Sequence, residues 1–84
     1  MDKSEIENIV KETIAKNLNI DIKEISNKSH FVKDLNLDSL DSIEMFMDIE
    51  DVFDLKIPNK KIDKLKTVQD AIDLITELNE NRNN

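Results

Sequence analysis

One serine stands at the start of the segment DSLDSIEMFMDIEDVF, residues 38–53. A serine hydroxyl becomes a nucleophile only when a neighbouring base removes its proton. The chain has one histidine, His30, in the preceding segment, where we expect it to anchor or cap local structure. No Ser-His-Asp set can be assembled from this sequence. Ser39 alone is therefore read as a helix cap, and if it does react, another protein must activate it.

A calcium loop is the second chemistry that the spacing suggests. Asp34, Asn36 and Asp38 alternate along the chain, as ligands do in an EF-hand. That loop also requires glycine at its sixth position and glutamate at its twelfth, where this chain has Ser39 and Met45. We therefore expect no intrinsic metal site.

The composition excludes several other site types. The 84 residues include no Cys, Gly, Trp or Tyr. Disulfide scaffolds, cysteine-based zinc sites, cysteine nucleophiles, P-loops and glycine-rich dinucleotide loops are excluded. A net charge of -7 opposes binding to nucleic acids and anionic membranes and favours basic protein partners.

The sequence shows no sign of membrane insertion or export. No apolar run approaches the ~20 residues of a membrane span. The first ten residues, MDKSEIENIV, are too charged for a signal peptide. We expect a cytoplasmic, monomeric protein with no stable membrane insertion and no nucleic-acid partner; a mature organelle protein that has lost its transit peptide would show the same features.

The residues around Ser39 must be positioned by helices. Ser4 and Glu7 match a capping box, and apolar residues at helical spacing then predict a first helix over residues 4–18. Asp38, with Asp41 three residues on, predicts the start of a second helix, which ends near residues 53–55. Between these helices lies a long segment whose scattered apolar residues predict a packed loop.

The last third of the chain predicts two further helices. Pro58 suits the start of a short helical turn through NKKIDKL. Thr67 and Asp70 form another capping box, which opens a final helix with one apolar face. We predict a single all-α domain over residues 1–78, a small bundle of three longer helices and one short one. The polar tail 79–84 should fray.

The second helix is unusual because it has two apolar stripes. With residues placed about 100° apart, one sector forms the expected core face: Ser42, Met45, Phe46, Ile49, Val52 and Phe53. Leu40, Ile43 and Met47 lie nearly opposite. The sector between them carries the acids Asp41, Glu44, Asp48 and Asp51. One explanation is that the second stripe is ordinary surface or is covered by the short helix. The other is that it is a docking face, beside a line of acids that attracts basic partners.

Two stretches together resemble a known family. FVKDLNLDSLDSIEMFMDIEDVFDLKIP, followed by TVQDAIDLI, resembles the acyl carrier proteins of bacterial-type (type II) fatty acid synthesis. The shared features are the Asp-Ser-Leu-Asp motif, the acidic helix after it, a phenylalanine then Ile-Pro, and Thr-Val-x-x-Ala-Ile at the last helix. The resemblance extends from about Ile6 to Ile75.

The resemblance implies a carrier that is not itself an enzyme. Ser39 would be the attachment point for a 4′-phosphopantetheine arm taken from coenzyme A. A phosphopantetheinyl transferase (holo-acyl-carrier-protein synthase) performs this step with magnesium, which Asp38 would help to hold during the modification. Growing fatty acyl chains would then be carried as thioesters on the arm's thiol.

The resemblance also implies two surfaces. Fatty acid synthesis enzymes, such as ketoacyl synthases, reductases, dehydratase and acyltransferases, would dock on the second helix. The matching positions are Asp38, Leu40, Asp41, Ile43, Glu44, Met47, Asp48 and Asp51. Acyl chains would enter between the helices, at a pocket formed by Phe46, Ile49, Ile62, Ala71 and Ile75.

The chain departs from the family pattern in two places. Asn36 and Leu37 stand where the family usually has small residues, and Leu37 could alter the approach of the arm or the transferase. Residues 60–66 are more basic than is common in the family. Two alternative functions stay open: a carrier of polyketide, aminoacyl or lipid intermediates, and an unmodified acidic interaction domain. The second would be indifferent to loss of the Ser39 hydroxyl.

Overall fold

The computed structural model describes residues 1–82, and this part of the chain contains helices and loops but no strand. The predicted set of three longer helices and one short one is confirmed. A short 3-10 helix lies in the long loop. The elements are α1 (Lys3–Leu18), η1 (Ile22–Glu24), α2 (Ser39–Phe53), α3 (Asn59–Ile62) and α4 (Val68–Arg82).

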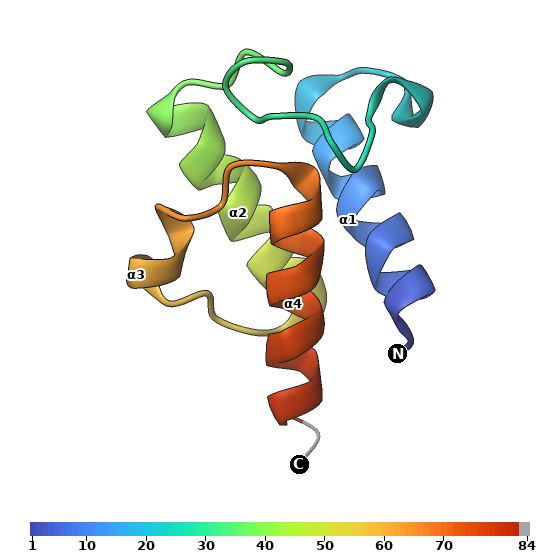
Figure 1. The fold of residues 1–84 in the computed structure, drawn as a ribbon, viewed down its shortest axis with the longest axis vertical. Coiled ribbons are helices and arrows are strands. Elements are labelled where there is room, and N and C mark those ends of the chain that lie inside the picture. The colour runs from blue at the N-terminus through green and yellow to red at the C-terminus, as the bar shows by residue number, and fades with distance from the viewer. Residues whose placement is uncertain (83–84) are drawn as a thin grey trace.

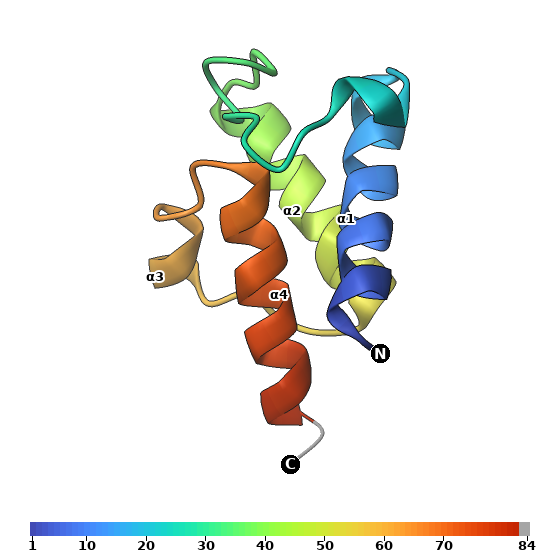
Figure 2. The same ribbon diagram turned by 45° about the vertical axis from the view of Figure 1, so that its right-hand side comes forward.

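The three longer helices form a bundle, and α3 lies beside it (Figure 1). Helix α1 runs toward the end that carries the long loop, and α2 and α4 begin at that end and run away from it. The turned view shows the same arrangement, with both termini far from the loop (Figure 2). The start of α2 therefore lies under the loop, at the end of the bundle opposite the termini.

Apolar side chains from the three longer helices and from the loop form one core. Ile6 of α1, Ile49 of α2 and Ile72 of α4 are almost completely buried. Phe31 of the loop packs edge-on against Phe46 of α2, with ring centroids 5.5 Å apart. This aromatic contact fixes the loop to α2 close to Ser39.

One residue predicted to face the core does not. Val52 is 56% exposed, whereas Met45 and Phe53 are buried and Ser42 is half-buried. At about 100° per residue, Val52 lies at the edge of the core sector, next to the acids. It therefore belongs to the surface of α2.

The helix starts agree with the sequence at α2 and α4 but not at α1. The Asp38 carboxylate accepts from the N–H of Asp41 at 2.8 Å, as predicted, although among the described residues no bond returns from the Asp41 carboxylate. Thr67 and Asp70 form the predicted reciprocal capping bonds. The first helix is capped by Asp2 and begins at Lys3, so the predicted cap at Ser4 was wrong.

Three sharp turns are made without glycine. Asn19, Asn36 and Asp54 have φ angles of 56°, 57° and 52°. Asn and Asp tolerate this left-handed region better than other residues with a Cβ. Asn19 and Asp54 end α1 and α2, and Asn36 turns the loop before Asp38.

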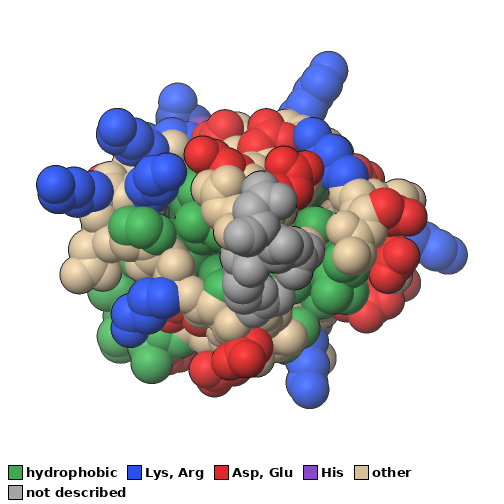
Figure 3. All heavy atoms as spheres, turned by 90° about the horizontal axis from the view of Figure 1, so that it is seen from below, with side chains coloured by type: hydrophobic (Ala, Val, Ile, Leu, Met, Phe, Trp, Pro, Cys, Tyr) green, Lys and Arg blue, Asp and Glu red, His purple; other side chains and the backbone are tan. Residues whose placement is uncertain are grey.

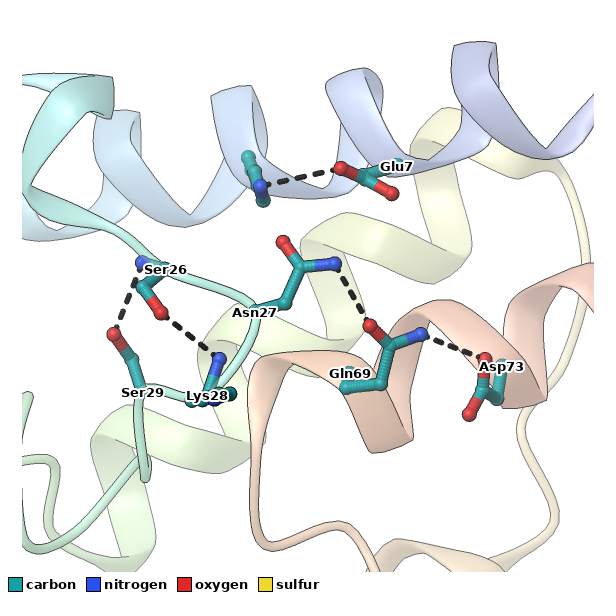
Figure 4. A network of polar contacts seen from close by, with 8 residues as sticks. Glu7, Ser26, Asn27, Lys28, Ser29, Gln69 and Asp73 are labelled. Carbon is teal, nitrogen blue, oxygen red and sulfur yellow. Dashed lines mark hydrogen bonds and ion pairs between the residues drawn. The ribbon is translucent and has the colours of Figure 1, made fainter.

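The long loop is packed, as predicted. Ile25 and Phe31 are buried. Figure 4 shows Asn27 of the loop donating to Gln69 of α4, at 2.7 Å between Nδ2 and Oε1. The backbone oxygen of Ser29 also accepts from the N–H of Val68 at 3.0 Å. The loop is therefore fastened to the start of α4 as well as to α2.

The end of the chain differs from the expected domain boundary. Helix α4 continues past residue 78 to Arg82, and Asn79 is buried. The part of the expected polar tail formed by residues 79–82 is thus helical, and residues 83 and 84 lie outside the described part. None of the described helices is long and apolar enough to cross a membrane.

Candidate functional site

Ser39 is the first residue of α2, and its side chain is exposed. Within residues 1–82 no group forms a hydrogen bond with its hydroxyl. The helix is capped by Asp38, so the capping role expected for Ser39 is filled by its neighbour. The hydroxyl is therefore free for chemistry with an external group.

His30 has the anchoring role that the sequence predicted. Its Nδ1 accepts from the backbone N–H groups of Val32 and Lys33 at 3.2 and 3.1 Å. Its own backbone N–H donates to the Asp34 carboxylate at 2.7 Å. Because the Nδ1 lone pair already accepts from two backbone N–H groups, it is not available to take a proton from Ser39. Ser39 has no activating histidine.

The unusual pair before Asp38 is accommodated locally. Asn36 supplies the left-handed turn, a role suited to a glycine or an asparagine. Leu37 is only 4% exposed and belongs to the core. Its bulk is directed into the bundle, so it does not cover Ser39.

The second apolar stripe of α2 is exposed. Leu40, Ile43 and Met47 are 64%, 50% and 56% exposed, so α3 does not cover them. All five acids at the expected docking positions are also exposed: Asp38, Asp41, Glu44, Asp48 and Asp51. The structure thus places an uncovered apolar stripe next to an uncovered line of carboxylates on one helix.

A hollow of about 490 Å³ opens beside Ser39. Its wall includes Ser39 and Ser42 from α2 and Ile62 from α3. The apolar lining residues come from the loop, α2 and the α3 region: Phe31, Val32, Ile43, Phe46, Ile62 and Leu65. The exposed hydroxyl and an apolar recess are therefore neighbours.

The five residues expected to form an acyl pocket are not all at this hollow. Phe46 and Ile62 line it. Ile49, Ala71 and Ile75 are not among its lining residues; they are 0%, 2% and 1% exposed and belong to the packed core. Periodicity could identify these three as buried but not as closed off from the hollow.

Basic side chains gather on the side of the molecule where α3 lies, at the left of Figure 3. The expected basic segment, residues 60–66, includes part of α3 and contains Lys60, Lys61, Lys64 and Lys66. Lys61 is 4.0 Å from Glu77 of α4. Lys66, together with Lys33 of the loop, also lines the hollow beside Ser39. The sequence did not indicate that Lys33 belongs to this site.

The alternating acids before Ser39 serve the backbone. Asp34 accepts from the N–H of His30, and Asp38 accepts from that of Asp41. In the part of the chain that the structure describes, no three Asp, Glu, His or Cys residues are placed to hold a metal ion.

Comparison with known proteins assigns the chain to a family. The family model described as "Phosphopantetheine attachment site" matches residues 8–79. An acyl carrier protein of Thermosynechococcus vestitus (strain NIES-2133 / IAM M-273 / BP-1) is 44% identical over 75 residues, which are 89% of this chain and 93% of that protein. With its all-helical bundle, the chain therefore belongs to the acyl carrier proteins, non-catalytic carriers whose cofactor is 4′-phosphopantetheine.

Proposed function

We propose that Ser39 is the attachment point of the 4′-phosphopantetheine arm, and that the protein carries fatty acyl chains for fatty acid synthesis. The observation that supports this best is the exposed Ser39 hydroxyl, which has no hydrogen-bond partner within residues 1–82 and stands beside the apolar hollow. The other serine of the hollow, Ser42, is half-buried and less accessible.

The residues around Ser39 fit the group. The first turn of a helix favours a negative charge, because its backbone N–H groups have no partners within the helix. A phosphodiester on Ser39 would be at this positive end of α2. Asp38 uses Oδ1 for the cap, and its Oδ2 forms no hydrogen bond within residues 1–82. That oxygen can help to hold magnesium during the transfer.

The chemistry that the arm supplies is a terminal thiol, which forms thioesters with acyl groups; the chain itself has no cysteine. The apolar lining of the hollow suits a hydrocarbon chain better than a polar cargo. We propose that an acyl chain enters along Phe46 and Ile62. The acyl chain would reach the buried Ile49, Ala71 and Ile75 only if the core opened to admit it.

We propose that partner enzymes dock on α2. The exposed Leu40, Ile43 and Met47 give an apolar contact, and Met47 adapts to different surfaces because its side chain is flexible. The adjoining carboxylates attract a basic surface and speed association. The proposed partners are the phosphopantetheinyl transferase and then the ketoacyl synthases, reductases, dehydratase and acyltransferases, each of which must release the carrier quickly.

The experiment is an intact-mass measurement before and after incubation with coenzyme A, magnesium and a phosphopantetheinyl transferase of broad specificity. Ser39→Ala tests the site, and Ser42→Ala is the matched control from the same hollow. We expect the parent and the control to gain one phosphopantetheine group, and Ser39→Ala to gain none. Because docking is charge-steered, the rate of gain should fall as salt is raised.

Either of two results would contradict the proposed attachment at Ser39, and a third would contradict the proposed docking. Modification of Ser39→Ala would place the arm elsewhere. No gain in the parent, with no group present from the start, would favour the unmodified interaction domain. A rate of modification that does not depend on salt would contradict only the proposed docking through the acids and would leave the attachment at Ser39 untouched.

A further inference from the structure

Two lysines from distant parts of the sequence meet at the hollow beside Ser39. Lys33 lies in the loop before α2, and Lys66 lies just before α4. The segments that carry them are joined two residues before Lys33, because the N–H of Phe31 donates to the backbone oxygen of Lys66 at 3.0 Å and His30 pairs with Thr67. The fold itself therefore places both side chains at this site.

Both ammonium groups are available to an anion. The two side chains are exposed, and neither ammonium is in an ion pair with a described residue. Lys33 and Lys66 differ in this from Lys11 and Lys61, which lie 3.3 and 4.0 Å from the carboxylates of Glu7 and Glu77. Lysine also has a long, flexible stem, so its charge can reach a group that is displaced from its own backbone.

The surroundings of Ser39 create a need for these charges. The net charge is -7, and Asp38 and Asp41 flank Ser39 within the first turn of α2. A phosphodiester on Ser39 would add another negative charge next to these two carboxylates. Charges repel one another over ~10 Å at 0.1 M salt, so the neighbouring acids would disfavour it. The charged residues that line the hollow are Lys33, Lys66, Asp38 and Asp63, so their formal charges sum to zero before the arm is attached.

We infer that Lys33 and Lys66 hold the phosphodiester of the arm on the hollow side of Ser39 and retain the arm along the hollow until a partner docks. This rests on the proposed attachment at Ser39. The acids Asp41, Glu44, Asp48 and Asp51 do not line the hollow, and their charges disfavour the opposite side of α2. The retention is electrostatic and exposed, so it is weak and depends on salt.

The experiment compares the parent, Lys33→Ala/Lys66→Ala and Lys23→Ala/Lys28→Ala, each as the unmodified and the mass-confirmed modified protein. Lys23 and Lys28 are exposed lysines that do not line the hollow, so both double variants have the same net charge. At low salt we expect modification to lower the Tm of Lys33→Ala/Lys66→Ala by about 2 to 5 °C more than that of the control. At about 1 M salt this difference should disappear.

A second measurement locates the arm without relying on stability. Backbone amide resonances of lining residues such as Val32, Ile62 and Leu65 should shift on modification in the parent and the control, and shift less without the two lysines. Equal Tm changes and equal shifts in all three proteins, each modified at Ser39, would overturn the lysine inference alone. Failure of Ser39 to accept the group would overturn both it and the proposed function.

Discussion

Glu50 fastens the end of α2 to the segment that leads to α3. Its Oε2 accepts from the backbone N–H of Ile57 at 2.7 Å, and its backbone oxygen accepts from Leu55 at 3.1 Å. Ile57 is only 1% exposed, so its N–H has no ready access to water. We expect Glu50→Ala to leave that donor buried and unpaired.

The size of the effect follows from this geometry. A hydrogen bond to a charged acceptor contributes roughly 1.5–3 kcal/mol, and an unpaired buried donor costs a similar amount. Glu50 is half-buried, so we expect a loss of about 2 kcal/mol, which lowers the Tm of a domain this size by roughly 8–16 °C. Glu50→Gln keeps an acceptor oxygen and should lose less.

The control is Asp51→Ala, which removes the same charge from the next residue of α2. Asp51 is exposed, and its side chain forms no hydrogen bond within residues 1–82, so its loss should change stability by at most about 0.5 kcal/mol. Urea unfolding followed by circular dichroism would measure all three variants, with equal m-values showing that only stability has changed. Equal midpoints for Glu50→Ala and Asp51→Ala would refute the argument.

Two further predictions concern the surface. Hydrogen bonding from Gln69, and then from Lys3, lowers the pKa of Asp73 below its ordinary value of 3.8. This stabilisation is present above the pKa of Asp73 in the unfolded chain and is lost as pH falls through its lowered pKa in the folded protein. Asp73→Asn should therefore reduce stability by about 0.5 kcal/mol at pH 7 but not at pH 2. An equal loss at both pH values, measured by urea unfolding, would contradict this prediction. Asn19→Ala should lower stability by about 1 kcal/mol in the same assay because of its φ of 56°, whereas Asn19→Gly should not; equal effects would refute this.

Much of the fold could be predicted because its signals are local. Apolar spacing and the caps at Asp38 and Thr67 fixed the positions of α2 and α4. The start of α1 was misplaced because both Ser4 and Asp2 are residue types that cap helices. The structure gives the extended backbone of a cap to Asp2 and places Ser4 inside the helix. Helix α4 extends past residue 78 and Asn79 is buried there, which a polar sequence does not reveal.

The site was predictable only in part, for a similar reason. Helical geometry placed Leu40, Ile43 and Met47 outside the core, because one small core cannot cover opposite sides of a helix, but it left open whether the short helix covers them; the structure shows them exposed. The arrival of Lys33 and Lys66 at one hollow depends on backbone pairing between the loop and the start of α4, which no local pattern encodes. The closed positions of Ile49 and Ile75 depend on packing in the same way.

Helix α3 contributes no buried residue, yet Ile62 forms part of the wall of the hollow. Segments with few buried contacts open locally at a small fraction of the global free energy. The α3 side of the proposed cargo site is therefore formed without a buried residue, whereas Phe31 and Phe46 on the other side also belong to the core. If the hollow holds the cargo as proposed, substitutions in α3 would adjust its width while the bundle stays intact, and a carrier of this design would acquire new cargo without first acquiring a new core.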